Sequence, residues 1–167
     1  MIRRCLSPSL VLLALNVPSG FAQSQNTSVG YNEAQVKAAF LFRLPKFIRW
    51  PDGRTSYHFC FEQESAVFET LKVLANSASL GTQVSILGEE PDASCDVIFN
   101  ANASFNAREH HHLLVSDTKN FANEGGMIEI SRRGSRLHLL INTASLERVD
   151  LIPSSQLLKL STLVSSD

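Results

Sequence analysis

The chain has 167 residues, 44% of them apolar, and a formal net charge of −1. That length and composition provide for one hydrophobic core and leave no room for a large multidomain enzyme. The mildly acidic balance, with its basic residues scattered, makes the chain a poor candidate for nucleic-acid binding.

The first 22 residues have the pattern of a secretory signal peptide, with an unusual buried N-terminal strand as the alternative. Arg3 and Arg4 supply positive charge, an apolar core at 10–15 is too short to span a bilayer, and small residues lead to Ala22. Cleavage there leaves 145 of the 167 residues. Because the leader carries two arginines and no acids, the charge changes from −1 to −3. We predict a soluble exported protein with a flexible segment at 23–30 and one domain at 31–167.

The cysteines that remain after removal of the leader are Cys60 and Cys95, each in a strand-like run and 35 positions apart. An exported compartment favours a disulfide between them. Two free buried thiols are the alternative. No CxxC spacing is present, so a catalytic dithiol pair is not expected.

The apolar pattern predicts alternating helices and strands. A helix at 32–49 is kinked by Pro45 and stopped by Pro51. Predicted strands follow at 57–61, 83–87, 96–100 and 113–116, with a hairpin at 127–131 and 136–142; predicted helices lie at 66–75, 105–111, 143–149 and from Ser154 to about Val164. This order predicts an α/β fold, a single three-layer domain. Its sheet is mixed and mainly parallel, with helices on both faces and an antiparallel hairpin at one edge.

Motifs that carry chemistry are scarce. The chain lacks GxGxxG, GxxxxGK[ST], HExxH and GxSxG, so we predict no enzyme, no catalytic residues and no cofactor. Nothing in the sequence brings Ser116, Asp117 and His138 together as a triad. The imidazoles at 110–112 resemble a metal-binding cluster, but we interpret them as a solvated loop and predict no metal site.

Two segments are candidates for binding. The loop from Asp117 to Gly126 follows a predicted central strand, where open α/β sheets place ligands. Asp117, Gly125 and Gly126 therefore form a weak candidate ligand loop, although a Gly-Gly pair also commonly starts a hairpin. Trp50 is either a core anchor or an interface hot spot.

Four blocks of the chain resemble the YfiR/HmsC family of bacterial periplasmic proteins. They are KAAFLFRLPKFIRWP at 37–51, the strand-borne Cys60 and Cys95, VSDTKNFANEGGMIEI at 115–130, and LHLLINTASLERVDLIPSSQLLKLSTLV at 137–164. The four blocks stand in the family's order and spacing, and the resemblance as a whole extends from about residue 31 to 164.

The resemblance implies a periplasmic regulator and no enzymatic activity. Relatives bind the periplasmic sensor part of an inner-membrane diguanylate cyclase and hold it inactive, and release raises cyclic-di-GMP and favours biofilm. Relatives also form homodimers and carry disulfides that link oxidation to activity. Cys60 and Cys95 match one such disulfide, but a second one has no counterpart here, which puts redox control in doubt. Pro45 also departs from the family pattern.

The segment Leu151, Ile152, Pro153, Ser154 places apolar residues in a connection, where polar ones are usual. In the family this part is associated with a partner or a ligand. We therefore hypothesise that it binds the partner together with Trp50, with core packing of Leu151 and Ile152 as the alternative. A periplasmic sensor of an unidentified small molecule is the alternative function, and an exported enzyme of unrecognised type is a weaker third.

Overall fold

A computed structural model describes residues 32–78, 81–87, 94–100, 111–134 and 136–165. The predicted leader, the segment 23–30 and all but the last residue of the predicted helix at 105–111 lie outside the described residues. Residues from Tyr31 onward form one compact unit.

The described elements are helices and strands, and five of the strands follow one another between the second and third α-helices. The helices are α1 (Glu33–Arg43), the 3₁₀ turn η1 (Leu44–Phe47), α2 (Ala66–Ala78), α3 (Thr143–Glu147) and α4 (Ser155–Lys159). The strands are β1 (Ile48–Arg49), β2 (His58–Phe61), β3 (Gln83–Ile86), β4 (Val97–Phe99), β5 (Leu113–Ser116), β6 (Ile128–Arg133), β7 (Arg136–Asn142), β8 (Ile152–Pro153) and β9 (Ser161–Val164).

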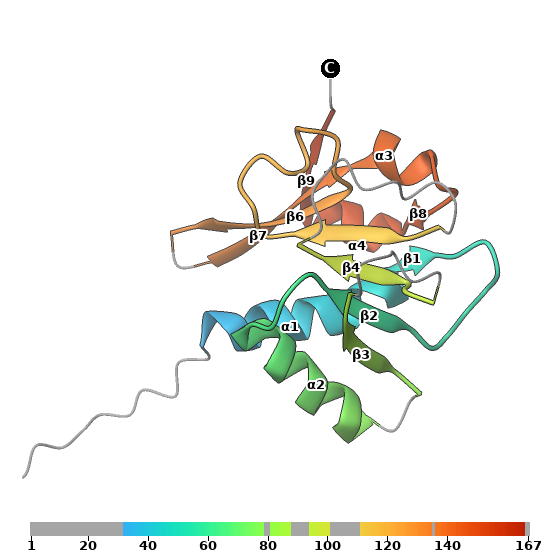
Figure 1. Cartoon of the computed structure of the whole chain (residues 1–167). Helices are drawn as coiled ribbons and strands as arrows, with labels where there is room; N and C mark the ends of the chain where they lie inside the picture. Colours follow the sequence, from blue (N-terminus) through green and yellow to red (C-terminus); the bar gives the residue numbers. More distant parts are fainter. Residues whose placement is uncertain (1–31, 79–80, 88–93, 101–110, 135, 166–167) are drawn as a thin grey trace, which may run out of the picture. The chain divides into compact units, whose positions relative to one another are not determined.

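Seven strands form one sheet in the order β3-β2-β4-β5-β6-β7-β9. All neighbours are parallel except the hairpin pair β6–β7. Figure 1 shows α1 and α2 beside β2 and β3 in its lower half and α3 in its upper half, near β8. The predicted α/β class with a mixed, mainly parallel sheet is therefore confirmed.

The C-terminal segment differs from the prediction of a helix to about Val164. The helix ends at Lys159, and β9 pairs in parallel with β7, with Leu139 opposite Ser161 and Asn142 opposite Val164. The hairpin thus lies at one side of the sheet, with β9 outside it. The helical prediction was wrong here because pairing with a distant strand outweighed the local apolar pattern.

The first helix begins and ends with identifiable signals. The Asn32 side chain accepts a hydrogen bond from the backbone of Ala34, and the Gln35 side chain accepts one from the Asn32 backbone. The α-helix ends at Arg43 and continues as a 3₁₀ turn that contains Pro45, so the proline ends the helix that it was predicted to kink.

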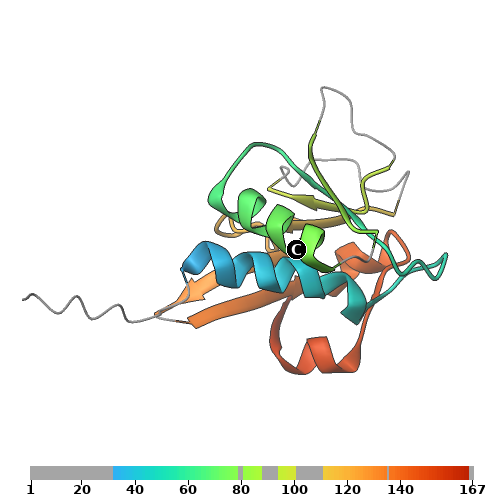
Figure 2. The same ribbon diagram turned by 90° about the horizontal axis from the view of Figure 1, so that it is seen from below.

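The core lies between the sheet and the two longer helices. In Figure 2, α1 and α2 lie side by side across one face of the sheet. Phe61 of β2 contacts Phe68 of α2 and Phe99 of β4, with 5.3 Å between ring centroids in each pair. Ala38 and Leu41 of α1 are fully buried. This packing fixes α1 on the sheet and leaves its other side facing β7 and α4.

Candidate functional site

An apolar groove of about 480 Å³ lies between α1, β7 and α4. We call it the α1–α4 groove. One wall consists of Val36, Ala39, Phe40, Arg43, Leu44 and Phe47. The other consists of Leu137, Leu139, Gln156, Leu157 and Leu160. A volume of this size is typical of binding pockets in proteins.

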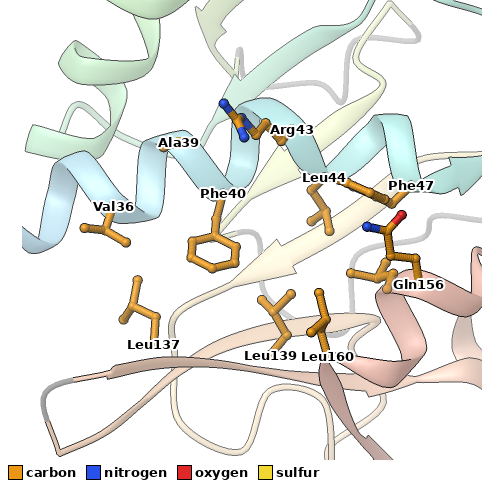
Figure 3. A pocket seen from close by; sticks show the side chains of 11 residues that line it. Val36, Ala39, Phe40, Arg43, Leu44, Phe47, Leu137, Leu139, Gln156 and Leu160 are labelled. Atoms are coloured by element: carbon orange, nitrogen blue, oxygen red, sulfur yellow. The ribbon is translucent and has the colours of Figure 1, made fainter.

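Helical periodicity explains why one helix both supports the core and lines the groove. Positions three and four apart lie on the same side of a helix, so Val36, Phe40 and Leu44 form a stripe that faces the groove. Leu44, three positions after Leu41, also joins the buried core. Figure 3 shows the Phe40 ring directed from α1 toward the β7 side of the groove, while the Arg43 guanidinium points away from it. The groove is therefore mainly apolar: Gln156 is the one uncharged polar residue among the described residues that line it, and the charge of Arg43 is directed outward.

Two groove residues remain accessible although they are large and apolar. Phe40 is 39% exposed and Leu160 is 73% exposed. Leu163 of β9 and Ile152 of β8 are exposed to a similar degree, at 56% and 49%. Of these four residues, Phe40 and Leu160 line the groove, and exposed apolar side chains of this kind are characteristic of interaction sites.

The two walls are joined by the small antiparallel pair β1–β8. Ile48 lies opposite Pro153 and Arg49 opposite Ile152. The Ser154 backbone N–H donates to the Phe47 carbonyl at 2.8 Å, and the Ser154 hydroxyl accepts from the Leu157 N–H at 3.3 Å. Ser154 thus caps α4 and also attaches it to the end of η1.

The hypothesised partner-binding residues separate into two groups. Leu151 is fully buried and Trp50 is 4% exposed, with its indole N–H donating to the Pro45 carbonyl at 3.0 Å. Neither side chain is available at the surface. We therefore correct the hypothesis for Trp50 and Leu151: both pack within the protein, which was the alternative for each. Ile152 is half exposed, and Pro153 and Ser154 are partly exposed. For these three residues the hypothesis stays a prediction.

The candidate ligand loop is tied down by contacts within the chain. The Asp117 carboxylate lies 2.7 Å from the Lys37 ammonium, and its backbone N–H donates to Asn100 Oδ1 at 3.0 Å. The Gly125 carbonyl accepts from the Ser145 hydroxyl, and a Cβ at Gly126 would overlap the Phe121 ring. These contacts give Asp117, Gly125 and Gly126 structural roles, and ligand binding by this loop stays a prediction.

Lys37 lies between two carboxylates, those of Asp117 and Glu33, at 2.7 and 2.8 Å. Partial burial opposes its charge, but the hydrogen bonds to Asp117 and Glu33 outweigh this and raise the pKa of Lys37 above its ordinary value. The hydrogen bond from Lys37 lowers the pKa of Glu33. The ion pairs attach α1 to the segment that follows β5.

Cys60 and Cys95 form a disulfide with a Cα–Cα distance of 5.8 Å, which confirms the predicted bond. Both residues are buried, and His58 lies beside them on the same strand as Cys60. The neighbouring His112 is also fully buried, with Nδ1 2.6 Å from the Cys95 carbonyl oxygen. The interpretation of residues 110–112 as a solvated loop is therefore wrong for His112, while His110 lies outside the described residues.

Ser116 makes no bond that suggests a nucleophile. Its hydroxyl donates to Asn100 Oδ1 at 3.0 Å and accepts from the Thr118 N–H. His138 lies half-buried on β7.

Sequence reasoning did not find the α1–α4 groove, although the stripe of Val36, Phe40 and Leu44 was a visible signal for it.

Comparison with known proteins decides the family. The YfiR/HmsC-like family model matches residues 34–162, a span that includes every element around the groove. The chain belongs to the YfiR/HmsC-like family. Members of this family are periplasmic regulators in cyclic-di-GMP signalling, not enzymes. No curated protein matches the chain in sequence. None of the helices in the described parts of this YfiR/HmsC-like chain is long and apolar enough to span a membrane.

Solved structures support the fold of this YfiR/HmsC-like chain. It is similar to a conserved domain protein from Vibrio cholerae O1 biovar El Tor, with a TM-score of 0.51 and 11% identity over 78% of this chain. It is similar to the same degree to an ABC domain in complex with L-Trp from Streptococcus pneumonia. The chain spans 60% of the length of each of these structures, and at this identity the likeness concerns the fold alone.

Proposed function

We propose that this protein is a periplasmic repressor that docks the periplasmic part of an inner-membrane diguanylate cyclase on the α1–α4 groove. Family membership supports a regulatory role in cyclic-di-GMP signalling. The observation that carries the docking proposal is the groove itself, an open apolar hollow with the exposed Phe40 and Leu160 at its two walls.

The chemistry of the groove suits a protein partner. Stable interfaces have an apolar centre that excludes water and a polar rim that remains solvated. Here the apolar stripe of α1 supplies the centre, and Arg43 and Lys46 are exposed on the same helix and the turn after it. An apolar side chain of the partner that enters between Phe40 and Leu160 would bury surface that is now in contact with water.

Repression needs only a difference in affinity. A regulator that binds the inactive form of a cyclase more tightly than the active form by about 1–3 kcal/mol changes its activity about 5–150-fold. Such control requires no catalytic group in the regulator. A homodimer, implied by the relatives, stays a prediction that sedimentation of the exported protein would check.

The test is a pull-down from a membrane extract of the protein's own organism, with the bound proteins identified by mass spectrometry. We expect recovery of an inner-membrane protein with a cytoplasmic cyclase domain. Leu160→Asp should abolish this recovery. The matched control is Val73→Asp, because Val73 is 64% exposed on α2 and lies outside the groove.

Cellular cyclic-di-GMP supplies the second measurement. Cells that export the Leu160→Asp variant should contain as much cyclic-di-GMP as cells without the protein, whereas Val73→Asp cells should match the wild type. Recovery of the same cyclase by both variants would contradict docking on the groove. Failure to recover any cyclase with the wild type would contradict the proposed partner.

A small-molecule sensor is the second candidate, and the volume of the groove favours it. A hollow of about 480 Å³ with mostly apolar walls falls within the range of ligand pockets. A thermal-shift screen of apolar metabolites would test it. A ligand that raises the melting temperature of the wild type but not that of Leu160→Asp would move the proposal from a protein partner to a metabolite.

A further inference from the structure

We propose that reduction of the Cys60–Cys95 disulfide converts this part of the protein into a zinc-binding site, with His58 as the third ligand. Within the described residues, these three form the one group whose ligand atoms lie close enough to hold a metal, all within 4.8 Å of one another. The site is separate from the α1–α4 groove, and its test does not depend on the proposed function.

The spacing is near that of a tetrahedral zinc site. Bonds of about 2.3 Å to sulfur and about 2.0 Å to nitrogen place neighbouring ligand atoms roughly 3.4–3.8 Å apart. The three side chains therefore need movements of about 1–2 Å, which rotation of the freed cysteine side chains provides. Two thiolates and an imidazole are the ligand types that zinc prefers, and the fourth position is left to water.

The imidazole of His58 is already oriented as a ligand. Its Nδ1 lies 3.2 Å from the Ser94 carbonyl oxygen and 3.0 Å from the Ser94 hydroxyl. Metal-binding histidines characteristically donate one ring N–H to a carbonyl, which fixes the tautomer and directs the other nitrogen to the metal. The other nitrogen, Nε2, lies 2.7 Å from the Ser85 hydroxyl, which in turn is 3.7 Å from Cys60 Sγ. The Ser85 hydroxyl thus contacts both the nitrogen and the sulfur that the metal would bridge.

The backbone around the three ligands is held independently of the disulfide. The His58 N–H donates to the Asp96 carboxylate at 2.7 Å, and the Asp96 N–H donates to the His58 carbonyl at 2.8 Å. Parallel pairing of β2 with β4 places Cys60 opposite Ile98. After reduction, the sheet therefore still keeps Cys60, Cys95 and His58 together.

The chemistry balances with a dithiol as the reductant. The dithiol gives two electrons and two protons to the Cys60–Cys95 bond and becomes a disulfide itself. Zinc then binds the two sulfurs as thiolates and releases the two thiol protons to solvent. The zinc ion takes the place of the disulfide as the cross-link between β2 and the start of β4.

The experiment titrates zinc into the exported protein, oxidised or reduced with a phosphine that is not a thiol ligand. We expect one zinc ion per reduced chain and none per oxidised chain. Cobalt in place of zinc should give the visible bands of a tetrahedral site with sulfur ligands. Zinc should also raise the melting temperature of the reduced protein.

Three variants distinguish a ligand from a structural residue. His58→Gln should weaken zinc binding by about tenfold or more. Ser85→Ala should bind as tightly as the wild type, because zinc displaces the Ser85 hydroxyl from Nε2. His138→Gln, a half-buried histidine outside the cluster, is the matched control and should be unchanged.

Several outcomes would overturn the proposal. Equal zinc affinity of His58→Gln and the wild type would remove His58 from the site. Equal binding by oxidised and reduced protein would place the metal elsewhere. If the reduced protein loses its circular-dichroism signal and zinc does not restore it, the site does not exist.

Discussion

The two sides of α1 carry similar residues but have different environments. On one side Ala38 and Leu41 are fully buried. On the other, Phe40 is 39% exposed and lines a groove. Both sides are apolar, so hydrophobicity alone does not distinguish a surface that holds the fold from one that is available to a partner. What distinguishes them is how closely the facing elements pack: one side is covered completely, whereas β7 and α4 leave a groove on the other.

The sharpest test of this contrast uses two adjacent residues. Leu151 is fully buried and Ile152 is 49% exposed. We expect Leu151→Asp to destabilise the fold by more than about 4 kcal/mol, because it buries an unpaired charge. Ile152→Asp should change stability by less than about 1 kcal/mol and abolish binding of the cyclase. Urea denaturation and the pull-down measure the two effects, and a large loss of stability in Ile152→Asp would place it in the core.

Loss of the disulfide tests the part of the sheet around β2 and β4, whose residues do not line the groove. The bond closes a loop of 35 residues, so its loss in metal-free buffer should lower the free energy of unfolding by about 3–4 kcal/mol. Denaturation of the oxidised protein and of a Cys60→Ser/Cys95→Ser double variant measures this difference. Binding at the groove should be retained in the folded fraction, and its loss would show that the two regions are coupled.

Truncations on α1 compare its two sides directly. Leu41→Ala should cost about 2–5 kcal/mol because it leaves a cavity in the core. Phe40→Ala should cost about 1 kcal/mol, since its ring is already partly in water. If urea denaturation gave the same loss of stability for Leu41→Ala and Phe40→Ala, the groove would have to close around Phe40 in solution.

The smallest expected effect concerns the ion pairs of Lys37. Lys37→Met should lower the melting temperature by about 2 °C at neutral pH, because partly exposed pairs contribute little. In the folded protein Lys37 lowers the pKa of Glu33 below 4.5. The stability that the ionised Glu33 adds is therefore present above pH 4.5 and is lost as the pH falls through the lowered pKa. The difference between the variant and the wild type should therefore shrink in acid. A difference independent of pH would exclude Glu33 as the cause.

Local patterns predicted much of this fold. The stretches around Val97 and Leu113 read as buried strands and are strands β4 and β5. The hairpin around Gly134 and a helix that begins near Ser154 were also predicted, because both depend on neighbouring residues. The segment after Leu160 was mistaken for helix, since its partner strand β7 lies about twenty residues earlier in the chain.

The groove was harder to predict than the fold. Its walls come from residues near 40 and near 157, which the sequence gives no reason to bring together. For Trp50 and Leu151 the sequence left both a surface role and core packing open, and the structure buries both side chains. The Cys60–Cys95 bond was predictable because the leader left two cysteines, whereas the placement of His58 beside them depends on the sheet.

The short helix α4 is fixed at both ends, and between them Leu157 is its one buried residue. Ser154 before it is bonded to Phe47, and Ser161 after it belongs to β9. In amide hydrogen exchange, the backbone of 156–160 should therefore open as a small unit of its own, while the flanking strands stay protected. One wall of the groove can thus adjust its shape to an occupant without disturbing the sheet that supports it.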